Sequence, residues 1–139
     1  MEKLCMGELN FLAIAVAGFA YFMLGALWFS PFVAGTYYDK ALGFTRTKDM
    51  KWGVIYYIGP FMGCVISTFA TAVLMRWCSV ISMGEATKLG LIVGMGYGMV
   101  ISITNAINPN TPRPLMYGLA TGGYHVIGNI MVSVLIYIM

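Results

Sequence analysis

The segment 114–139, PLMYGLATGGYHVIGNIMVSVLIYIM, decides the fold because it contains no Asp, Glu, Lys or Arg. A helix needs about 20 apolar residues to cross roughly 30 Å of hydrocarbon. Residues 9–38, 52–75 and 89–112 are also uncharged and long enough to cross it. Backbone groups in lipid must be bonded within the protein, which leaves helices or closed barrels. Barrel strands would alternate polar and apolar residues, whereas residues 132–139 are apolar almost without a break. The sequence therefore predicts four transmembrane helices.

The overall composition supports the same class of protein. Of the 139 residues, 60% are apolar and only 9% are charged, against about 25% charged residues in soluble domains. So few charges exclude a soluble enzyme, and disordered chains are polar and highly charged. We expect one all-α integral membrane domain over residues 1–139, an up-down bundle with short loops. Its helices are expected at about 9–30, 50–76, 83–108 and 113–138.

Local signals place several helix ends. Pro31 should end the first helix near Phe29, because the residue before a proline avoids helical angles. Residues 37–42 are amphipathic and could form a short interfacial helix. Thr47 or Asp49 can cap the second helix.

A capping box is expected at the start of the third helix. Ser82 and Glu85 have the spacing at which each side chain accepts a hydrogen bond from a free amide of the first turn. This pair should fix where the third helix begins.

The cationic residues give the orientation. Five Lys or Arg residues fall in the first and third loops and three fall on the opposite side, and the positive-inside rule then places both termini outside the cytoplasm. The net charge of +3 fits this loop bias or anionic lipid headgroups. No basic run is long enough for nucleic acid. The loop cations are Lys40, Arg46, Lys48, Lys51 and Arg113, and the others are Lys3, Arg76 and Lys88.

Small residues recur at four-residue spacing on the second and third helices. Such stripes let helix backbones approach in lipid, where no hydrophobic force drives association. We expect these two helices to pack tightly, against each other or across a subunit boundary. The packing residues are Gly59, Gly63 and Ser67 on the second helix, with Thr71 continuing the stripe, and Gly90, Gly94, Gly98 and Ser102 on the third.

A polar stripe runs down the fourth helix at Thr121, His125, Asn129 and Ser133. An unpaired polar group in hydrocarbon costs several kcal/mol, so the stripe must face protein or water. His125, the only histidine, lies roughly 16 Å deep at 1.5 Å per residue. It could relay protons, sense pH or contact a ligand. It could equally be a neutral imidazole that holds the bundle together.

A second polar group is expected near the side of the first and third loops. It could form a vestibule that binds a headgroup or anion, or it could be ordinary capping and interfacial anchoring. Its members are Trp28, Ser30, Asn105, Asn108 and Arg113.

Catalytic and metal-binding patterns are weak. The sequence contains no paired intramembrane carboxylate, nucleophile elbow or phosphate loop, and Cys5, Cys64 and Cys78 show no metal-ligand spacing. We predict no cofactor and no metal, and the balance is against an enzyme.

Motifs at both ends of the chain closely resemble a bacterial membrane family, the domain-of-unknown-function family numbered 1761. The resemblance implies four transmembrane helices in a bacterial cytoplasmic membrane and supplies no activity. It gives weight to His125, which falls within the resembling Gly-Tyr-His segment. The candidate intramembrane site is Thr121, Tyr124, His125 and Asn129. Tyr38 departs from the pattern, since tryptophan is common there. The motifs are Asn10, Trp28-Phe29-Ser30-Pro31, Gly35, Tyr38, Gly43, Pro114, Leu115 and Gly123-Tyr124-His125.

Two functional hypotheses follow from these patterns. The first is a homo-oligomer that binds or passes a small solute, ion or proton along the fourth helix. The second is an accessory or structural subunit of a larger membrane complex, or a lipid-binding stabiliser. An enzyme acting on a lipid or quinone is a third reading, without a nucleophile–base pair to support it. The expected partners are the lipid bilayer and a second copy of the chain or a larger complex.

Overall fold

The computed structural model describes residues 9–47 and 49–139, and this part of the chain is helical without any strand. Four of its helical segments are long and apolar enough to cross a membrane. The third of these contains a π-helical stretch, η2, between two α-helical parts. The elements are α1 (Phe11–Trp28), α2 (Gly35–Leu42), α3 (Ile55–Trp77), α4 (Met83–Val93), η2 (Gly94–Met99), α5 (Val100–Ala106) and α6 (Pro114–Ile138).

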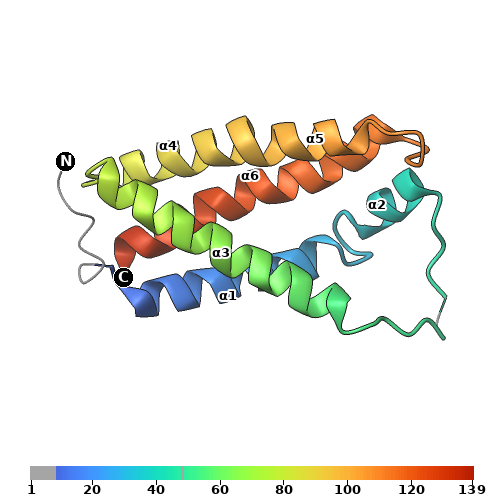
Figure 1. The fold of residues 1–139 in the computed structure, drawn as a ribbon, viewed down its shortest axis with the longest axis horizontal. Coiled ribbons are helices and arrows are strands. Elements are labelled where there is room, and N and C mark those ends of the chain that lie inside the picture. The colour runs from blue at the N-terminus through green and yellow to red at the C-terminus, as the bar shows by residue number, and fades with distance from the viewer. Residues whose placement is uncertain (1–8, 48) are drawn as a thin grey trace.

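The long helices alternate in direction, and α6 lies among the others (Figure 1). It packs against α1, α3, α4, η2 and α5, and its first part also meets α2. The start of α1 lies beside the end of α6, where Asn10 Nδ2 donates to the carbonyl of Met139 at 3.1 Å. Short α2 lies at the other end of the molecule (Figure 1). The polar stripe of α6 is therefore surrounded by protein on several sides.

The first helix ends where Pro31 predicts. Helix α1 stops at Trp28 and its C-cap is Phe29. The chain then turns tightly, because the amide of Gly35 donates to the carbonyl of Ser30 at 2.9 Å. A Cβ on Gly35 would overlap the carbonyl oxygen of Phe29, so this turn requires glycine.

Helix α2 covers the expected residues 37–42 and begins two residues earlier, at Gly35. Its Tyr38 ring packs against Phe29 of the preceding turn, with centroids 5.0 Å apart, and against Tyr117 of α6, at 5.3 Å. The pKa of Tyr38 is raised to about 12, chiefly because the ring is buried and secondly because Tyr117 lies beside it. Tyr38 therefore links α2 to the turn after α1 and to the start of α6.

The second membrane helix begins later than expected. Helix α3 starts at Ile55, and neither Thr47 nor Asp49 caps it, so that capping prediction is wrong. The amides of Tyr56 and Tyr57 instead donate to the carbonyls of Gly53 and Val54. These backbone bonds satisfy two of the first-turn amides without a side-chain cap.

The third span begins with the expected Ser82 cap in modified form. Ser82 Oγ accepts from the amide of Glu85 at 3.2 Å. The Glu85 carboxylate accepts from Ile81 at 2.8 Å and not from Ser82 itself. The start of the helix is therefore fixed by hydrogen bonds to the amides of Ile81, before the cap, and Glu85, after it.

The three stripe glycines of the third span, Gly90, Gly94 and Gly98, pack against α6 and not against α3. A Cβ added at Gly90 would lie 2.6 Å from the carbonyl oxygen of Asn129. At Gly94 it would lie 2.7 Å from the Cα of Val126. At Gly98 it would lie 2.7 Å from the Cβ of His125.

The glycines of the two stripes therefore do not pack against each other within the described chain, which corrects that alternative; packing across a subunit boundary stays a prediction. Cβ atoms added at Gly59 and Gly63 of α3 would meet nothing within 4 Å. A stripe of small residues predicts close backbone approach but carries no information about the partner. Helix α6 supplies reciprocal small residues, since Gly118 and Gly122 lie against Ile103 and Met99.

Candidate functional site

Three side chains form a hydrogen-bonded group at mid-span between α1 and α6. The hydroxyl of Tyr21 lies 2.7 Å from His125 Nδ1. The amide nitrogen of Asn129 donates to the Tyr21 hydroxyl at 3.3 Å and to the carbonyl of His125 at 2.8 Å. The group joins one residue of α1 to two residues of α6.

The histidine tautomer decides which way the Tyr21–His125 bond runs. Because Asn129 donates to the Tyr21 oxygen, the tyrosine proton is free to donate to His125 Nδ1. In that direction Nδ1 accepts, and the neutral imidazole carries its proton on Nε2. This tautomer offers an N–H donor on the ring edge away from Tyr21.

Tyr124 belongs to a separate contact. Its hydroxyl donates to the carbonyl of Tyr21 at 3.1 Å and lies 3.3 Å from the sulfur of Cys64. Since the tyrosine proton is used on that carbonyl, the thiol is the donor in the second bond. Tyr124 is buried and ties α1, α3 and α6 together. Of the four residues in the predicted intramembrane site, Tyr124 is the one that holds helices together and does not line the cavity.

A cavity of about 440 Å³ lies between α3, the third span and α6. His125, Asn129 and Thr121 of the predicted stripe all line it. The Thr121 hydroxyl donates to the carbonyl of Tyr117 at 2.9 Å, so its lone pairs remain available as acceptors. The cavity lining contains no Asp, Glu, Lys or Arg; it is formed by Ser67, Val93, Tyr97, Gly98, Ile101, Ser102, Asn105, Tyr117, Thr121, His125 and Asn129.

Asn129, which lines this cavity, has a buried hydrogen-bonding atom without a partner. The residue is only 4% exposed, and its Oδ1 has no hydrogen-bond partner. A buried acceptor without a partner costs about 1–3 kcal/mol. The same residue lines the cavity and its Oδ1 is itself buried, so a bound donor group meets this oxygen once the amide turns toward the cavity.

The polar residues predicted to form a vestibule are dispersed. Trp28 donates from Nε1 to a backbone carbonyl of α6 at 2.9 Å, and the buried hydroxyl of Ser30 has no partner. Asn105 lines the mid-span cavity. Asn108 bonds within its own turn, and Arg113 lines a different hollow beside α2. The structure does not bring these five residues together at one site.

Sequence reasoning missed Tyr21 of α1, which completes the histidine group. One signal was available. Tyr21 lies ten residues after Phe11, where α1 begins, and His125 lies eleven residues after Pro114, where α6 begins. Two side chains near the middle of antiparallel helices share a depth, so Tyr21 was a natural partner for an intramembrane histidine.

Metal ligands do not cluster in the described part of the chain. Across residues 9–47 and 49–139, no three His, Cys, Asp or Glu side chains lie close enough to hold a metal ion. Cys64, which shares the depth of the histidine group, bonds to Tyr124.

A family model matches residues 12–137, which is nearly the whole chain. The family is described as protein of unknown function, DUF1761. The chain belongs to this family. No curated protein and no solved structure matches this DUF1761 chain. The description carries no activity, so the cavity of the DUF1761 chain has to be interpreted from its own chemistry.

Proposed function

We propose that this DUF1761 chain is an up-down four-helix protein of the bacterial cytoplasmic membrane that binds a small uncharged polar solute beside α6. His125 Nε2 donates to the solute, and Asn129 Oδ1 accepts from it. The unpartnered Oδ1 of a nearly buried Asn129 is the observation that carries the proposal. A molecule with one donor and one acceptor would satisfy both groups together.

The chemistry of the cavity favours a neutral solute over an ion. Its lining contains hydroxyls, amides and one imidazole, together with apolar Val93 and Ile101, and no charged side chain. Moving an unpaired ion into such surroundings carries a large desolvation cost. Amides, ureas and small alcohols match the lining better than metal cations, carboxylates or a hydrated proton.

The extent of the cavity favours binding over passage. Along α6 it runs from Tyr117 to Asn129, about 18 Å at 1.5 Å per residue. One turn further, Val132 and Ser133 are completely buried. A solute can therefore reach mid-span from the α2 end, and its further progress would require these side chains to move.

The single histidine provides a direct assay. Protein labelled with ¹⁵N-histidine in nanodiscs should show the tautomer protonated on Nε2, and titration with acetamide, urea or glycerol should shift the Nε2 resonance. Asn129→Leu should abolish the shift while leaving the helical circular dichroism unchanged. Asn110→Leu, a loop variant outside the cavity, is the matched control. No response to any of the three probes, or an equal response in Asn129→Leu, would overturn the proposal.

We also propose that the chain forms a homo-oligomer, with an accessory role in a larger complex as the alternative. The supporting observation is that Gly59 and Gly63 of α3 lie open to the outside, with room for a second backbone. Native mass spectrometry should find an oligomer that Gly63→Leu dissociates. Gly96→Leu, at an equally open glycine of η2, should not dissociate it. A monomeric wild-type chain would refute self-association.

A further inference from the structure

A second hollow, of about 600 Å³, lies beside α2 and contains most of the cationic groups of that end of the molecule. Arg46, Lys40 and Arg113 line it, and Asp39 is its single acidic residue. Three positive charges and one negative charge leave a surplus of two. These residues come from α2, the following loop and the start of α6, so the tertiary fold assembles the cluster.

Backbone contacts hold the three segments together. The amide of Arg113 donates to the carbonyl of Ala41 at 3.1 Å, which joins the start of α6 to the last turn of α2. Gly43 adopts a φ of 64°, a left-handed conformation that ends α2 and turns the loop back. Pro112 lies beside this glycine.

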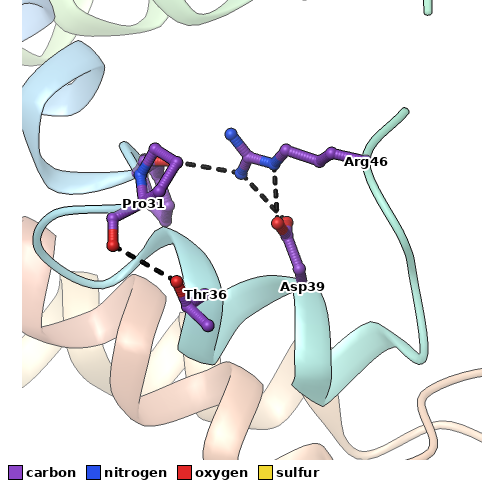
Figure 2. A network of polar contacts seen from close by, with 5 residues as sticks. Pro31, Thr36, Asp39 and Arg46 are labelled. Atoms are coloured by element: carbon purple, nitrogen blue, oxygen red, sulfur yellow. Dashed lines mark hydrogen bonds and ion pairs between the residues drawn. The ribbon is translucent and has the colours of Figure 1, made fainter. Parts of the chain in front are cut away.

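Arg46 is oriented by the protein and still has donors to spare. Its Nε lies 2.6 Å from Asp39 Oδ2, and its Nη2 donates to Asp39 Oδ1 at 2.9 Å and to the carbonyl of Phe29 at 3.1 Å. Figure 2 shows this fork, with Nη1 pointing away from it. Across the described residues Nη1 has no hydrogen-bond partner, so two N–H groups on an immobilised guanidinium remain for a ligand.

The two other cations are uncommitted within the described part of the chain. No hydrogen bond or ion pair holds the Lys40 ammonium or the Arg113 guanidinium there, whereas Arg46 is tied to Asp39. Guanidinium forks and an ammonium together recognise phosphate oxygens by charge-assisted hydrogen bonds. The chemistry of the hollow is therefore that of a phosphate site.

The position of the hollow indicates where the phosphate comes from. Its residues lie in the connections between spans, at the level where α1 ends and α6 begins. Phe32, in the turn leading into α2, is 94% exposed. An exposed phenylalanine beside a cationic hollow fits the boundary between headgroups and acyl chains better than open water.

From these contacts we propose that Lys40, Arg46 and Arg113 bind the phosphate of an anionic membrane lipid. The surplus positive charge selects a lipid with net negative charge over a zwitterionic one. Asp39 positions Arg46 and does not itself touch the phosphate. This site is separate from the mid-span cavity and does not depend on the solute proposal.

Lipid retention by the full purified chain tests the assignment. Native mass spectrometry should show that phosphatidylglycerol is retained in preference to phosphatidylcholine with the same acyl chains. Arg113→Gln and Lys40→Gln should each weaken retention about fivefold, the factor expected for one cation near a membrane surface. Lys88→Gln removes one positive charge from α4, at the other end of the bundle, and should leave retention unchanged.

Three results would refute the lipid-phosphate site. Equal retention of the two lipids, or an equal loss in Lys88→Gln and Arg113→Gln, would overturn it. Inorganic phosphate is the third probe: if it binds through Lys40 and Arg113 while phosphatidylglycerol does not, the lipid assignment fails. Unchanged circular dichroism in the glutamine variants shows that altered retention does not come from misfolding.

Discussion

Two glycines of η2, only two residues apart, should respond in opposite ways to alanine. Gly94 faces α6, where an added Cβ would lie 2.7 Å from the Cα of Val126 and 3.1 Å from the carbonyl oxygen of His125. Gly96 faces outward, and its Cβ would meet nothing within 4 Å. The two substitutions make the same chemical change in the same helical segment, so local helix propensity cannot separate them.

The magnitude follows from the clash at Gly94. Favourable carbon–carbon contacts lie at about 3.5–4.0 Å, so the third span must move from α6 by roughly 1 Å. A gap of that size forfeits about a quarter to a half of the dispersion energy along the contact. Overpacking of this kind typically costs about 1–3 kcal/mol. Gly96→Ala carries no such cost and gains at most about 1 kcal/mol in helix propensity.

The measurement is reversible unfolding in mixed micelles of dodecyl sulfate, followed by far-ultraviolet circular dichroism. Gly94→Ala should lower the free energy of unfolding by about 1–3 kcal/mol, and Gly96→Ala should leave it unchanged or raise it slightly. Equal destabilisation by both substitutions would show that the third span does not pack on α6 through this face. Greater destabilisation by Gly96→Ala would reverse the assigned face altogether.

Three further predictions concern Tyr21, Tyr38 and the labelling of Cys78. Tyr21→Phe removes the hydroxyl that joins His125 to Asn129, which should cost about 1–3 kcal/mol in the same unfolding assay and alter the histidine ¹⁵N resonances; a phenylalanine at exposed Tyr56, as control, should do neither. The pKa of Tyr38 near 12 means that the folded chain keeps this proton after the unfolded chain has lost it, so the contribution of Tyr38 to stability is complete below about pH 10 and lost as the pH rises through 12. Tyr38→Phe should remove the component of the tyrosinate absorbance titration near pH 12, and an unchanged titration would contradict the burial of this ring. In cells whose chain keeps Cys78 as its only cysteine, an impermeant maleimide should label that exposed residue from outside, and labelling only after lysis would invert the proposed orientation. Buried Cys64 as the sole cysteine should stay unlabelled in folded protein.

The spans could be predicted from sequence because the bilayer imposes a length and excludes charge. The four expected segments all contain a long apolar helix. Pro31 and Ser82 act through local backbone chemistry, so the helix ends that depend on them were also accessible. The start of α3 was not, because backbone carbonyls of Gly53 and Val54 take the place of a side-chain cap.

Which helix contacts which could be learned only from the three-dimensional structure. The stripe at Gly90 and Gly94 predicted a close approach to another helix backbone. Both α3 and α6 contain small residues that could accept it, and the structure shows that α6 makes the contact. The polar stripe of α6 placed His125 and Asn129 correctly on one helix. Their link to Tyr21 depends on how α1 is rotated, which a nearly uniform apolar helix does not encode in its own pattern.

The π-helical stretch Gly94–Met99 has a consequence for insertions and deletions. A π turn carries one residue more than the α turn it replaces, so it sets the rotational phase of everything that follows in the third span. Deleting one residue here would let the stretch close as ordinary α-helix, and the later residues would keep nearly their present direction, because the wide turn absorbs one residue. If the stretch became α-helical with all its residues kept, the contact face at Gly90 would stay in place, while Ser102 and Asn105 would rotate by about 100°, away from the cavity they now line. One extra residue in one turn thus keeps the two halves of this helix directed at the same neighbour.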